Sequence, residues 1–439
     1  MSSKTSSKTS SKTLLIIGYV WPEPNSSAAG TRMMQLIALF QTQGWSITFA
    51  SPSNRGEHRT DLSVLGIEEQ LIELNNESFD RFIEQLQPGL VIFDRFMMEE
   101  QFGWRIEKQA PQAIRILNTE DLHSLRAVRQ QIIKDYLNTQ PDMIDLQAIP
   151  LLDAQILFEK MAATDLAKRE IASLFRCDVT LMISEFEMTL LQQQFQVPIR
   201  QLIYLPFLYE NGPESPLKTF DERQNFIAIG NFRHEPNWDA VLWLKQEIWP
   251  RIRQQLPKAE LHIYGAYPPK KATQLHNAQQ GFKVMGWAEN AFDVLSQARV
   301  CLAPLRFGAG IKGKLAEAML CGTPNMTTSI GIESMQIKNS DTWGGFIANQ
   351  ADDFAIQAVK LYQSPELWQT AQQQGCEIVT NRYLQTPEMT QPLLDTINEL
   401  TTGLERHRAT NFMGAMLNHH HHKSTQYMAQ WIEAKNRLE

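Results

Sequence analysis

The sequence predicts an α/β protein built from two doubly wound domains with parallel sheets. The chain has 439 residues, and single hydrophobic cores rarely grow past about 250–300 residues. Short apolar runs alternate with segments of helical periodicity, which is typical of a parallel sheet covered by helices on both faces. This alternation stops once, near the middle of the chain, and then restarts. Two such domains in tandem imply a cleft between them, and ligands of such folds bind at the carboxyl ends of the strands.

Composition narrows the class of protein. Hydrophobic residues make up 43% of the chain and charged residues 20%, with a formal net charge of -7, which argues against nucleic acid as a partner. No apolar run approaches the ~18 residues of a membrane-spanning helix. The four cysteines lie far apart without C-x-x-C spacing, which favours a reducing, cytoplasmic location. Composition leaves the oligomeric state open.

The first predicted domain covers residues 14–208. Its strands are expected at residues 14–20, 47–50, 90–93, 113–117, 179–183 and 202–205. A segment rich in small residues follows the first strand and ends at Gly30. We expect a flexible loop there, whose backbone approaches an acceptor or phosphate oxygens.

A linker is predicted at residues 209–222, where Asn-Gly-Pro and a second proline interrupt the pattern. The second domain is predicted at residues 223–400. Its strands are expected at residues 225–230, 260–264, 282–286, 299–304, 325–328 and 345–348, with a long helix opened by Pro236 and another at residues 311–321.

The two ends differ from the domains. Residues 2–13 are three copies of Ser-Ser-Lys-Thr, so residues 1–13 are predicted to be a disordered tail. Residues 401–439 are predicted to be a helical tail docking across the two domains through a stripe that includes Tyr427, Met428 and Trp431. The histidine run at 419–422 is interpreted as native sequence.

Residues 304–324 carry the clearest chemical signal. Gly308, Gly310 and Gly313 lie in a turn between a buried strand and an amphipathic helix. Backbone N–H groups at a helix start attract anions, and Lys312 and Lys314 add two full charges there. This turn is therefore predicted to bind a diphosphate.

Two familiar phosphate motifs nearly match this turn. The glycines fit G-x-G-x-x-G, but they follow about the fourth strand of their domain, and Glu333 is poorly placed as a ribose acid, which disfavours NAD. Residues 308–314 also give G-x-x-x-x-G-K, but Leu315 stands where a P-loop needs Ser or Thr for magnesium, which disfavours an ATPase.

Glu317 follows Lys314 by three residues, so both approach one helix face. A carboxylate beside a diphosphate can accept hydrogen bonds from the two hydroxyls of a ribose. The alternative is an ordinary glutamate in a first helical turn, where the helix dipole favours acids. Spacing alone does not decide between them.

Three segments together resemble glycosyltransferases of family 4. Residues 227–237 resemble the opening of their donor domain, residues 308–324 their nucleotide-sugar signature, and residues 14–51 their acceptor-domain start; the resemblance extends over residues 14–400. It implies the GT-B architecture and retaining transfer from a nucleotide sugar, such as a UDP- or GDP-sugar, without metal or other cofactor. It also implies a glycan or lipid-linked acceptor, and with it peripheral contact at the inner membrane face.

The family's residues carry over only in part. Glu317 matches the second glutamate of its E-x7-E motif, whereas Ala309 replaces the first. The Arg and Lys that commonly clamp the diphosphate fall near Asn231 and Asn237, which are neutral. The clamping charge is then expected from Lys312, Lys314, Arg233 and Arg306, and the nucleotide base against the backbone near Gly286 and Trp287.

In the first domain, residues 118–126 follow a predicted strand and face the cleft. The family often places a histidine here to contact the donor sugar, a place that His123 or Asp121 would fill. Glu120 and Asp121 are also candidate acid–base groups. Arg126, with Arg129 three residues on, forms either a basic face for an anionic acceptor or an ordinary solvated helix face, and the spacing does not decide between them. The structural alternative makes Asp121 the N-cap of the following helix.

The motifs leave three functions open. No Asp-x-Asp, His-Glu-x-x-His or Gly-x-Ser-x-Gly motif is present, which disfavours a metal-bridged donor, zinc peptidase chemistry and a serine hydrolase. We expect a retaining, metal-independent glycosyltransferase. The alternatives are a nucleotide-sugar epimerase or hydrolase on the same fold, and a non-catalytic nucleotide-sugar-binding protein.

Overall fold

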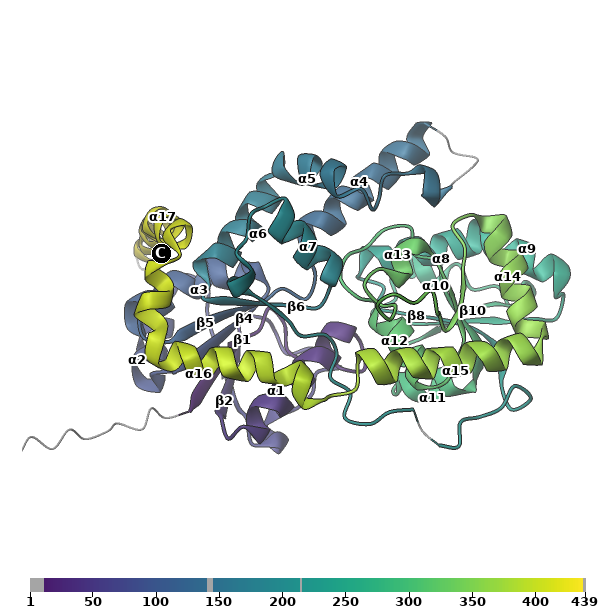
Figure 1. Ribbon diagram of the computed structural model, residues 1–439, viewed down its shortest axis with the longest axis horizontal. Coiled ribbons are helices and arrows are strands. Elements are labelled where there is room, and N and C mark those ends of the chain that lie inside the picture. The colour runs from purple at the N-terminus through teal and green to yellow at the C-terminus, as the bar shows by residue number, and fades with distance from the viewer. Residues whose placement is uncertain (1–11, 140–144, 214, 437–439) are drawn as a thin grey trace, which may run out of the picture.

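Two parallel sheets, one in each of two lobes, organise the chain (Figure 1). The computed structural model describes residues 12–139, 145–213 and 215–436, so most of the predicted N-terminal tail lies outside the described residues. Both sheets are built from parallel pairs only. The predicted fold class is confirmed.

The first sheet has the strand order β3-β2-β1-β4-β5-β6-β7. Its strands are β1 (Thr13–Ile17), β2 (Ser46–Ser51), β3 (Glu68–Leu71), β4 (Leu90–Asp94), β5 (Ile114–Asn118), β6 (Val179–Met182) and β7 (Leu202–Tyr204). All the predicted strands of this domain are present. The additional strand β3 has the sequence Glu-Glu-Gln-Leu and lies at the sheet edge, so it lacks the apolar run of a buried strand.

Alternation along the strands divides the first domain's core in two. In β1, Leu14 and Ile16 join one buried cluster, and Leu15 and Ile17 join the other, because successive side chains point to opposite faces of a sheet. The helices of this lobe are α1 (Ala28–Thr42), α2 (Ser78–Leu86), α3 (Phe96–Gln109), α4 (His123–Thr139), α5 (Ala154–Ala162), α6 (Asp165–Arg176) and α7 (Glu185–Gln193), with short 3-10 turns at Leu62–Leu65, Leu146–Ala148 and Ile199–Gln201.

The second sheet has the order β10-β9-β8-β11-β12-β13. Its strands are β8 (Gln224–Ile229), β9 (Leu261–Tyr264), β10 (Phe282–Gly286), β11 (Ala298–Ala303), β12 (Asn325–Thr327) and β13 (Gly345–Ile347). Its helices are α8 (Glu235–Trp243), α9 (Trp249–Gln255), α10 (Lys270–Thr273), α11 (Ala291–Gln297), α12 (Gly313–Leu320), α13 (Ser329–Ile332), α14 (Ala351–Gln363) and α15 (Pro365–Arg382). The long helix predicted from Pro236 is α8 and α9 joined by a π-helical turn at Leu244–Ile248.

The chain returns to the first lobe after α15 (Figure 1). Tyr209, leaving the first domain, pairs with Leu384, coming back. Helix α16 (Pro387–Ala409) then covers the first sheet. Its stripe of Leu393, Ile397 and Leu400 is buried with strand residues of that sheet. The boundary predicted at residue 400 therefore divides a helix that packs on the first domain, not the second.

The last helix, α17 (Phe412–Asn436), also packs on the first domain, against α3, α6 and α16. Ala429 is buried there, and Glu433 pairs with Arg105 at 2.7 Å. Over its described residues the tail thus packs on the first domain and not across the two domains, and the predicted docking stripe faces outward, since Tyr427 and Trp431 are 67% and 65% exposed. Of the histidine run, the side chains of residues 420–422 lie outside the described residues.

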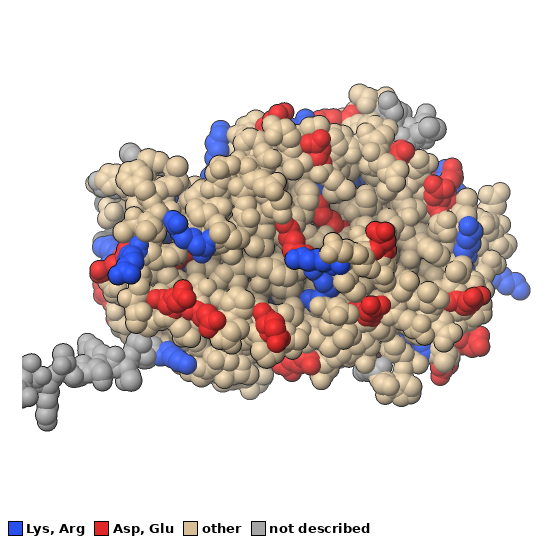
Figure 2. All heavy atoms as spheres, viewed as in Figure 1, with Lys and Arg blue, Asp and Glu red and all other residues tan. Residues whose placement is uncertain are grey.

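Acidic and basic side chains are interspersed over the face seen in Figure 2, and neither sign forms a large patch there. Over residues 12–139, 145–213 and 215–436, no helix is both long and apolar enough to cross a membrane.

Candidate active site

The glycine-rich turn lies between β11 and α12 and contacts the first domain. An added Cβ on Gly313 would lie 2.3 Å from the Cβ of Ala28 in α1. Gly310 has φ +62°, and its Cβ would lie 3.0 Å from the Cβ of Asp121. Contacts this short leave no room for a side chain, so these glycines let the two domains approach each other.

Lys314 reaches across the second domain to the loop after β8. Its Nζ donates a 2.5 Å hydrogen bond to Oδ1 of Asn237, whose amide donates at 3.0 Å to the carbonyl oxygen of Asn231. Burial lowers the pKa of Lys314 to about 8. An ammonium therefore stands beside the two asparagines that occupy the places of the family's clamping Arg and Lys.

Lys312 is held within the turn itself. Its buried Nζ donates a 2.5 Å hydrogen bond to the carbonyl oxygen of Gly310. Burial lowers the pKa of Lys312, and the nearby charge of Glu333 opposes this effect.

Glu317 lies on α12, one turn beyond Lys314, and is 9% exposed. Burial raises the pKa of its carboxyl group to about 7, although the charge of Lys314 lowers it. Its carboxylate lines the cleft and accepts no hydrogen bond from any residue that the structure describes. A nearly buried carboxylate without donors is suited to accept them from a ligand.

The two candidate arginines of the second domain have different surroundings. The Arg233 guanidinium stacks 3.7 Å from the ring centre of Tyr267 and lines the cleft. Arg306 is instead bound to Asp239 by two hydrogen bonds, at 2.8 and 2.5 Å. Arg306 does not line the cleft, because the Asp239 carboxylate on α8 holds its guanidinium, and its role in donor binding stays a prediction.

Of the two residues predicted to lie near the nucleotide base, only Trp287 lines the cleft, and Gly286 does not. Gly286 ends β10 with φ +85° and does not line the cleft. The Trp287 ring does line it, stacked on His58 with ring centres 4.0 Å apart, and its Nε1 donates to the carbonyl oxygen of Asn25. Trp287 therefore bridges the two domains at the edge of the cleft.

The first-domain wall begins at the carboxyl end of β5. Glu120 has φ +62° and accepts a 2.7 Å hydrogen bond from the Asn118 amide. The buried Arg32 guanidinium lies 3.7 Å from the same carboxylate. Burial raises the pKa of Glu120 to about 7, against the lowering effect of Arg32, and nearby Asp94 raises it further.

Asp121, His123 and Arg126 form a connected group on this wall. Arg126 donates a short hydrogen bond to Asp121, and His123 Nε2 lies 3.6 Å from the other oxygen of Asp121. Burial raises the pKa of Asp121, but Arg126 and His123 together hold it well below its usual value. Burial lowers the pKa of His123 to about 4, so the imidazole is neutral at pH 7.

The capping role considered for Asp121 belongs to Glu170. This α6 carboxylate accepts hydrogen bonds from the backbone N–H groups of His123 and Ser124 at 2.8 and 3.0 Å. Asp121 is thereby left to face the cleft.

Arg129 does not belong to a basic face. It is buried and makes a bidentate ion pair with Glu333 of the second domain, at 2.9 and 2.5 Å, and it also donates to the carbonyl oxygen of Gly308. Glu333 therefore already has a partner within the protein, and its presence does not require a ribose ligand.

A single cleft of about 700 Å³ brings fifteen of the seventeen predicted site residues together, all but Gly286 and Arg306. Gly30 lines it from the first turn of α1, capped by Ser27, and not from a loop as predicted. The lining residues that the sequence analysis missed include Tyr19 and Arg95, which lie just after β1 and β4. Their positions at strand ends were the available signal. Within the described residues, no cluster of three or more His, Cys, Asp or Glu side chains could hold a metal.

Comparison with known proteins agrees with this geometry. Residues 223–364 match the family of group 1 glycosyl transferases, and no curated protein matches the sequence. Three similar solved structures are a sucrose-phosphate synthase from Thermosynechococcus elongatus (16% identity, TM-score 0.60, 88% of this chain and 98% of that one), HepE from Anabaena in complex with UDP-glucose (11%, 0.62, 88% and 100%) and WaaG, a glycosyltransferase of lipopolysaccharide biosynthesis (12%, 0.59, 89% and 100%). The predicted GT-B architecture is confirmed, and the match of residues 223–364 agrees with the predicted glycosyltransferase class.

Proposed function

We propose that this chain, whose second domain is that of a group 1 glycosyltransferase, moves a sugar from a nucleoside diphosphate sugar to a glycan acceptor with retention of configuration. The observation that carries the proposal is the pairing of Lys314 and Glu317 on one helix. The Lys314 ammonium binds the diphosphate. The Glu317 carboxylate, which accepts no hydrogen bond from the described protein residues, accepts hydrogen bonds from the two ribose hydroxyls. UDP is the first nucleotide to test, because the Anabaena relative was solved with UDP-glucose.

Catalysis in this proposal comes mainly from stabilising the charge that develops on the leaving diphosphate. Lys314, Lys312 and the N-terminus of α12 face that charge. The bond between the anomeric carbon and the diphosphate oxygen breaks while the acceptor oxygen bonds to the same face of that carbon. The acceptor proton passes to the leaving phosphate oxygen, so no protein base and no metal is required.

The first domain positions the reactants. Asp121 is ionised and bound to Arg126, so it serves as a hydrogen-bond acceptor and not as a proton carrier. Neutral His123 can hydrogen-bond a sugar hydroxyl. Glu120, with a pKa of about 7, is a carboxyl group lining the cleft whose charge changes near neutral pH. A saccharide or lipid-linked acceptor is supported by the lipopolysaccharide pathway named for WaaG.

Thermal unfolding with EDTA present tests the donor site. UDP, GDP, ADP and NAD are added separately, and a ligand at 100 times its dissociation constant should stabilise the protein by about 2.7 kcal/mol. We expect a shift with one nucleoside diphosphate and none with NAD. A donor carrying that nucleotide is then incubated with glycan acceptors, and NMR of the product reports the anomeric configuration. A shift with NAD alone, or an inverted product, would contradict the proposal.

One observation favours a second candidate, a non-catalytic nucleotide-sugar-binding protein. Ala309 lines the cleft where the family has its first glutamate, so the sugar loses one expected partner. Nucleotide binding without transfer or hydrolysis across the donor panel would support this candidate. Product formation without any acceptor would instead indicate an epimerase or hydrolase.

A further inference from the structure

A second cavity, of about 370 Å³, lies between α4 of the first domain and α8 of the second. We call it the α4–α8 groove. Its walls include Gln130, Ile133, Lys134 and Leu137 from α4, and Phe232 and Trp238 from the second domain. It is distinct from the cleft that holds Lys314 and Glu317, neither of which lines it.

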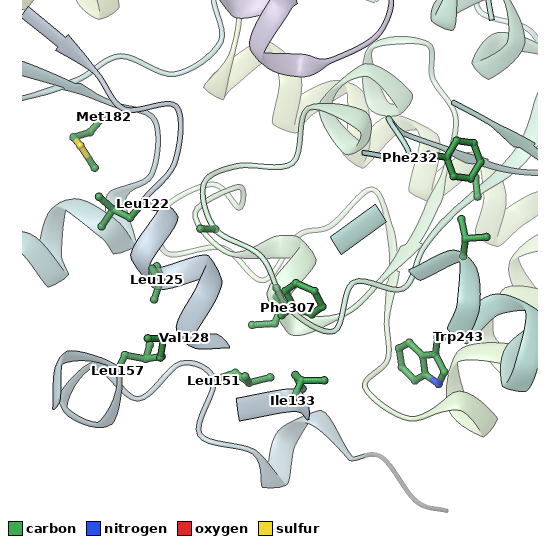
Figure 3. Close-up of a cluster of buried hydrophobic side chains, with 14 of the residues drawn as sticks. Leu122, Leu125, Val128, Ile133, Leu151, Leu157, Met182, Phe232, Trp243 and Phe307 are labelled. Carbon is green, nitrogen blue, oxygen red and sulfur yellow. The ribbon is translucent and has the colours of Figure 1, made fainter. Parts of the chain in front are cut away.

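The groove and the cleft adjoin. Arg233 and Phe307 line both cavities. Figure 3 draws Ile133, Phe232 and Phe307, which reach this region from the two domains. Along α4, Arg126 lines the cleft and Lys134 lines the groove, eight residues or about 12 Å farther along the helix axis. A molecule that occupies both must therefore be longer than a single sugar.

The charge of the groove is opposite to that of the chain. Lys134, Lys271 and Arg233 line it, and none of them pairs with a carboxylate among the described residues. Two acids also line the groove. The charge of Asp239 is neutralised by Arg306, so only Glu235 is left to neutralise one of the three cations. The groove thus carries a net positive charge in a protein of net charge -7, which favours an anionic occupant.

The groove also offers aromatic surface. Trp238 is half-buried beside Phe232, with ring centres 6.4 Å apart, and the Lys271 ammonium lies 4.6 Å from the Trp238 ring centre. Aromatic rings with polar neighbours combine apolar contact with hydrogen bonding. This combination suits a sugar ring, which has C–H faces and hydroxyl edges.

We infer that the α4–α8 groove binds the distal part of an anionic oligosaccharide acceptor, while the acceptor's terminal hydroxyl reaches the cleft past Arg233 and Phe307. The identity of the bound molecule as an acceptor rests on the proposed function; the binding of an anionic glycan does not. The acidic groups of the glycan, carboxylate, sulfate or phosphate, would contact Lys134 and Lys271.

Calorimetric titration with two probes tests this inference. The probes are the sulfated pentasaccharide fondaparinux and the neutral pentasaccharide maltopentaose. The groove variant is Lys134→Glu with Lys271→Glu. The matched control is Lys160→Glu with Lys258→Glu, which changes the net charge equally at exposed lysines, one per domain, away from the groove.

We expect wild-type protein to bind fondaparinux at least tenfold more tightly than maltopentaose. The groove variant should lose at least tenfold in fondaparinux affinity, and the control less than threefold. Equal losses in both variants, or no preference for the anionic probe, would overturn the inference. UDP affinity is measured on all three proteins and should be unchanged in both variants. Absence of UDP binding in the wild type would remove the proposed donor site without touching the groove.

Discussion

The ammonium of Lys314 lies 2.5 Å from the side-chain oxygen of Asn237, although the two residues are 77 positions apart. Through this hydrogen bond, Lys314 of α12 places its positive charge beside the loop after β8. In the family that the second domain resembles, cations for the diphosphate come from that loop itself. Here the loop is neutral at Asn231 and Asn237, and Lys314 supplies its charge from the opposite side.

Replacing Lys314 by Ala should weaken UDP binding at least tenfold. A hydrogen bond to a charged partner contributes about 1.5–3 kcal/mol, and each 1.4 kcal/mol changes a dissociation constant about tenfold. Lys258→Ala, at an exposed lysine without a hydrogen bond or ion pair in the described structure, is the control and should leave the affinity unchanged. Titration calorimetry measures both.

A rescue variant separates lost charge from lost structure. In Lys314→Ala combined with Asn237→Lys, the ammonium returns to the position it reached before, from the other side. Most of the UDP affinity should return. If the double variant binds no better than Lys314→Ala, the diphosphate does not lie at this point.

The raised pKa of Glu317 predicts a pH-dependent preference for ribose. Burial raises this pKa to about 7, and the ionised form accepts ribose hydroxyls better than the acid does. The affinity ratio of UDP to 2′,3′-dideoxy-UDP should therefore rise between pH 6 and pH 8. The phosphate and Lys314 titrations cancel in this ratio. A ratio that stays constant with pH would remove Glu317 from the ribose site.

The same shift has a consequence for stability. Because the folded-state pKa lies above the ordinary value of 4.5, ionisation of Glu317 destabilises the fold progressively from about pH 4.5 to 7 and by a constant amount above that range. Glu317→Gln should accordingly raise Tm at pH 8 and leave it unchanged at pH 4. A lower Tm at pH 8 would indicate that the carboxylate has a stabilising partner.

The ion pair of Arg129 and Glu333 is predicted to hold the domains together. Arg129→Met leaves the Glu333 carboxylate buried without a partner and should cost about 3–5 kcal/mol in the free energy of unfolding. The double variant with Glu333→Met should recover much of that loss. Arg169→Met breaks a pair whose arginine is 54% exposed and should cost under about 1 kcal/mol. Urea denaturation of the four proteins checks this, and equal losses for Arg129→Met and Arg169→Met would refute it.

Sequence reasoning located the cleft well because strand ends are visible in the pattern. Apolar runs mark the strands, and polar residues directly after them, such as Glu120 and Asp121 after β5, meet at one sheet edge. The same rule applied to the observed ends of β1 and β4 would have added Tyr19 and Arg95, but the first strand was predicted to run to residue 20, past Tyr19. Strand β3 was missed because an edge strand with a polar sequence has no such run.

The sequence pattern could not show which distant residues contact each other in the fold. Arg306 and Arg233 are both cations close to predicted strand ends, and only the fold shows that Asp239 occupies one of them. Likewise, the amphipathic pattern of α16 indicates one buried face but not which lobe buries it. These outcomes depend on distant residues, which local periodicity does not encode.

The close approach of Gly313 to Ala28 predicts that a side chain at position 313 would disturb the arrangement of the two domains. A methyl group on Gly313 would lie 2.3 Å from the Ala28 Cβ, and neither backbone can move without shifting α1 against α12. Gly313→Ala should therefore separate the domains, increase the radius of gyration in solution scattering and weaken UDP binding. Ala28→Gly removes the opposing methyl group, so the double variant should regain the wild-type radius and affinity. Gly403→Ala, in α16 with no atom near its added Cβ, should instead raise stability by about 0.5–1 kcal/mol. If Gly313→Ala keeps the wild-type radius and affinity, the two domains do not depend on this contact for their arrangement.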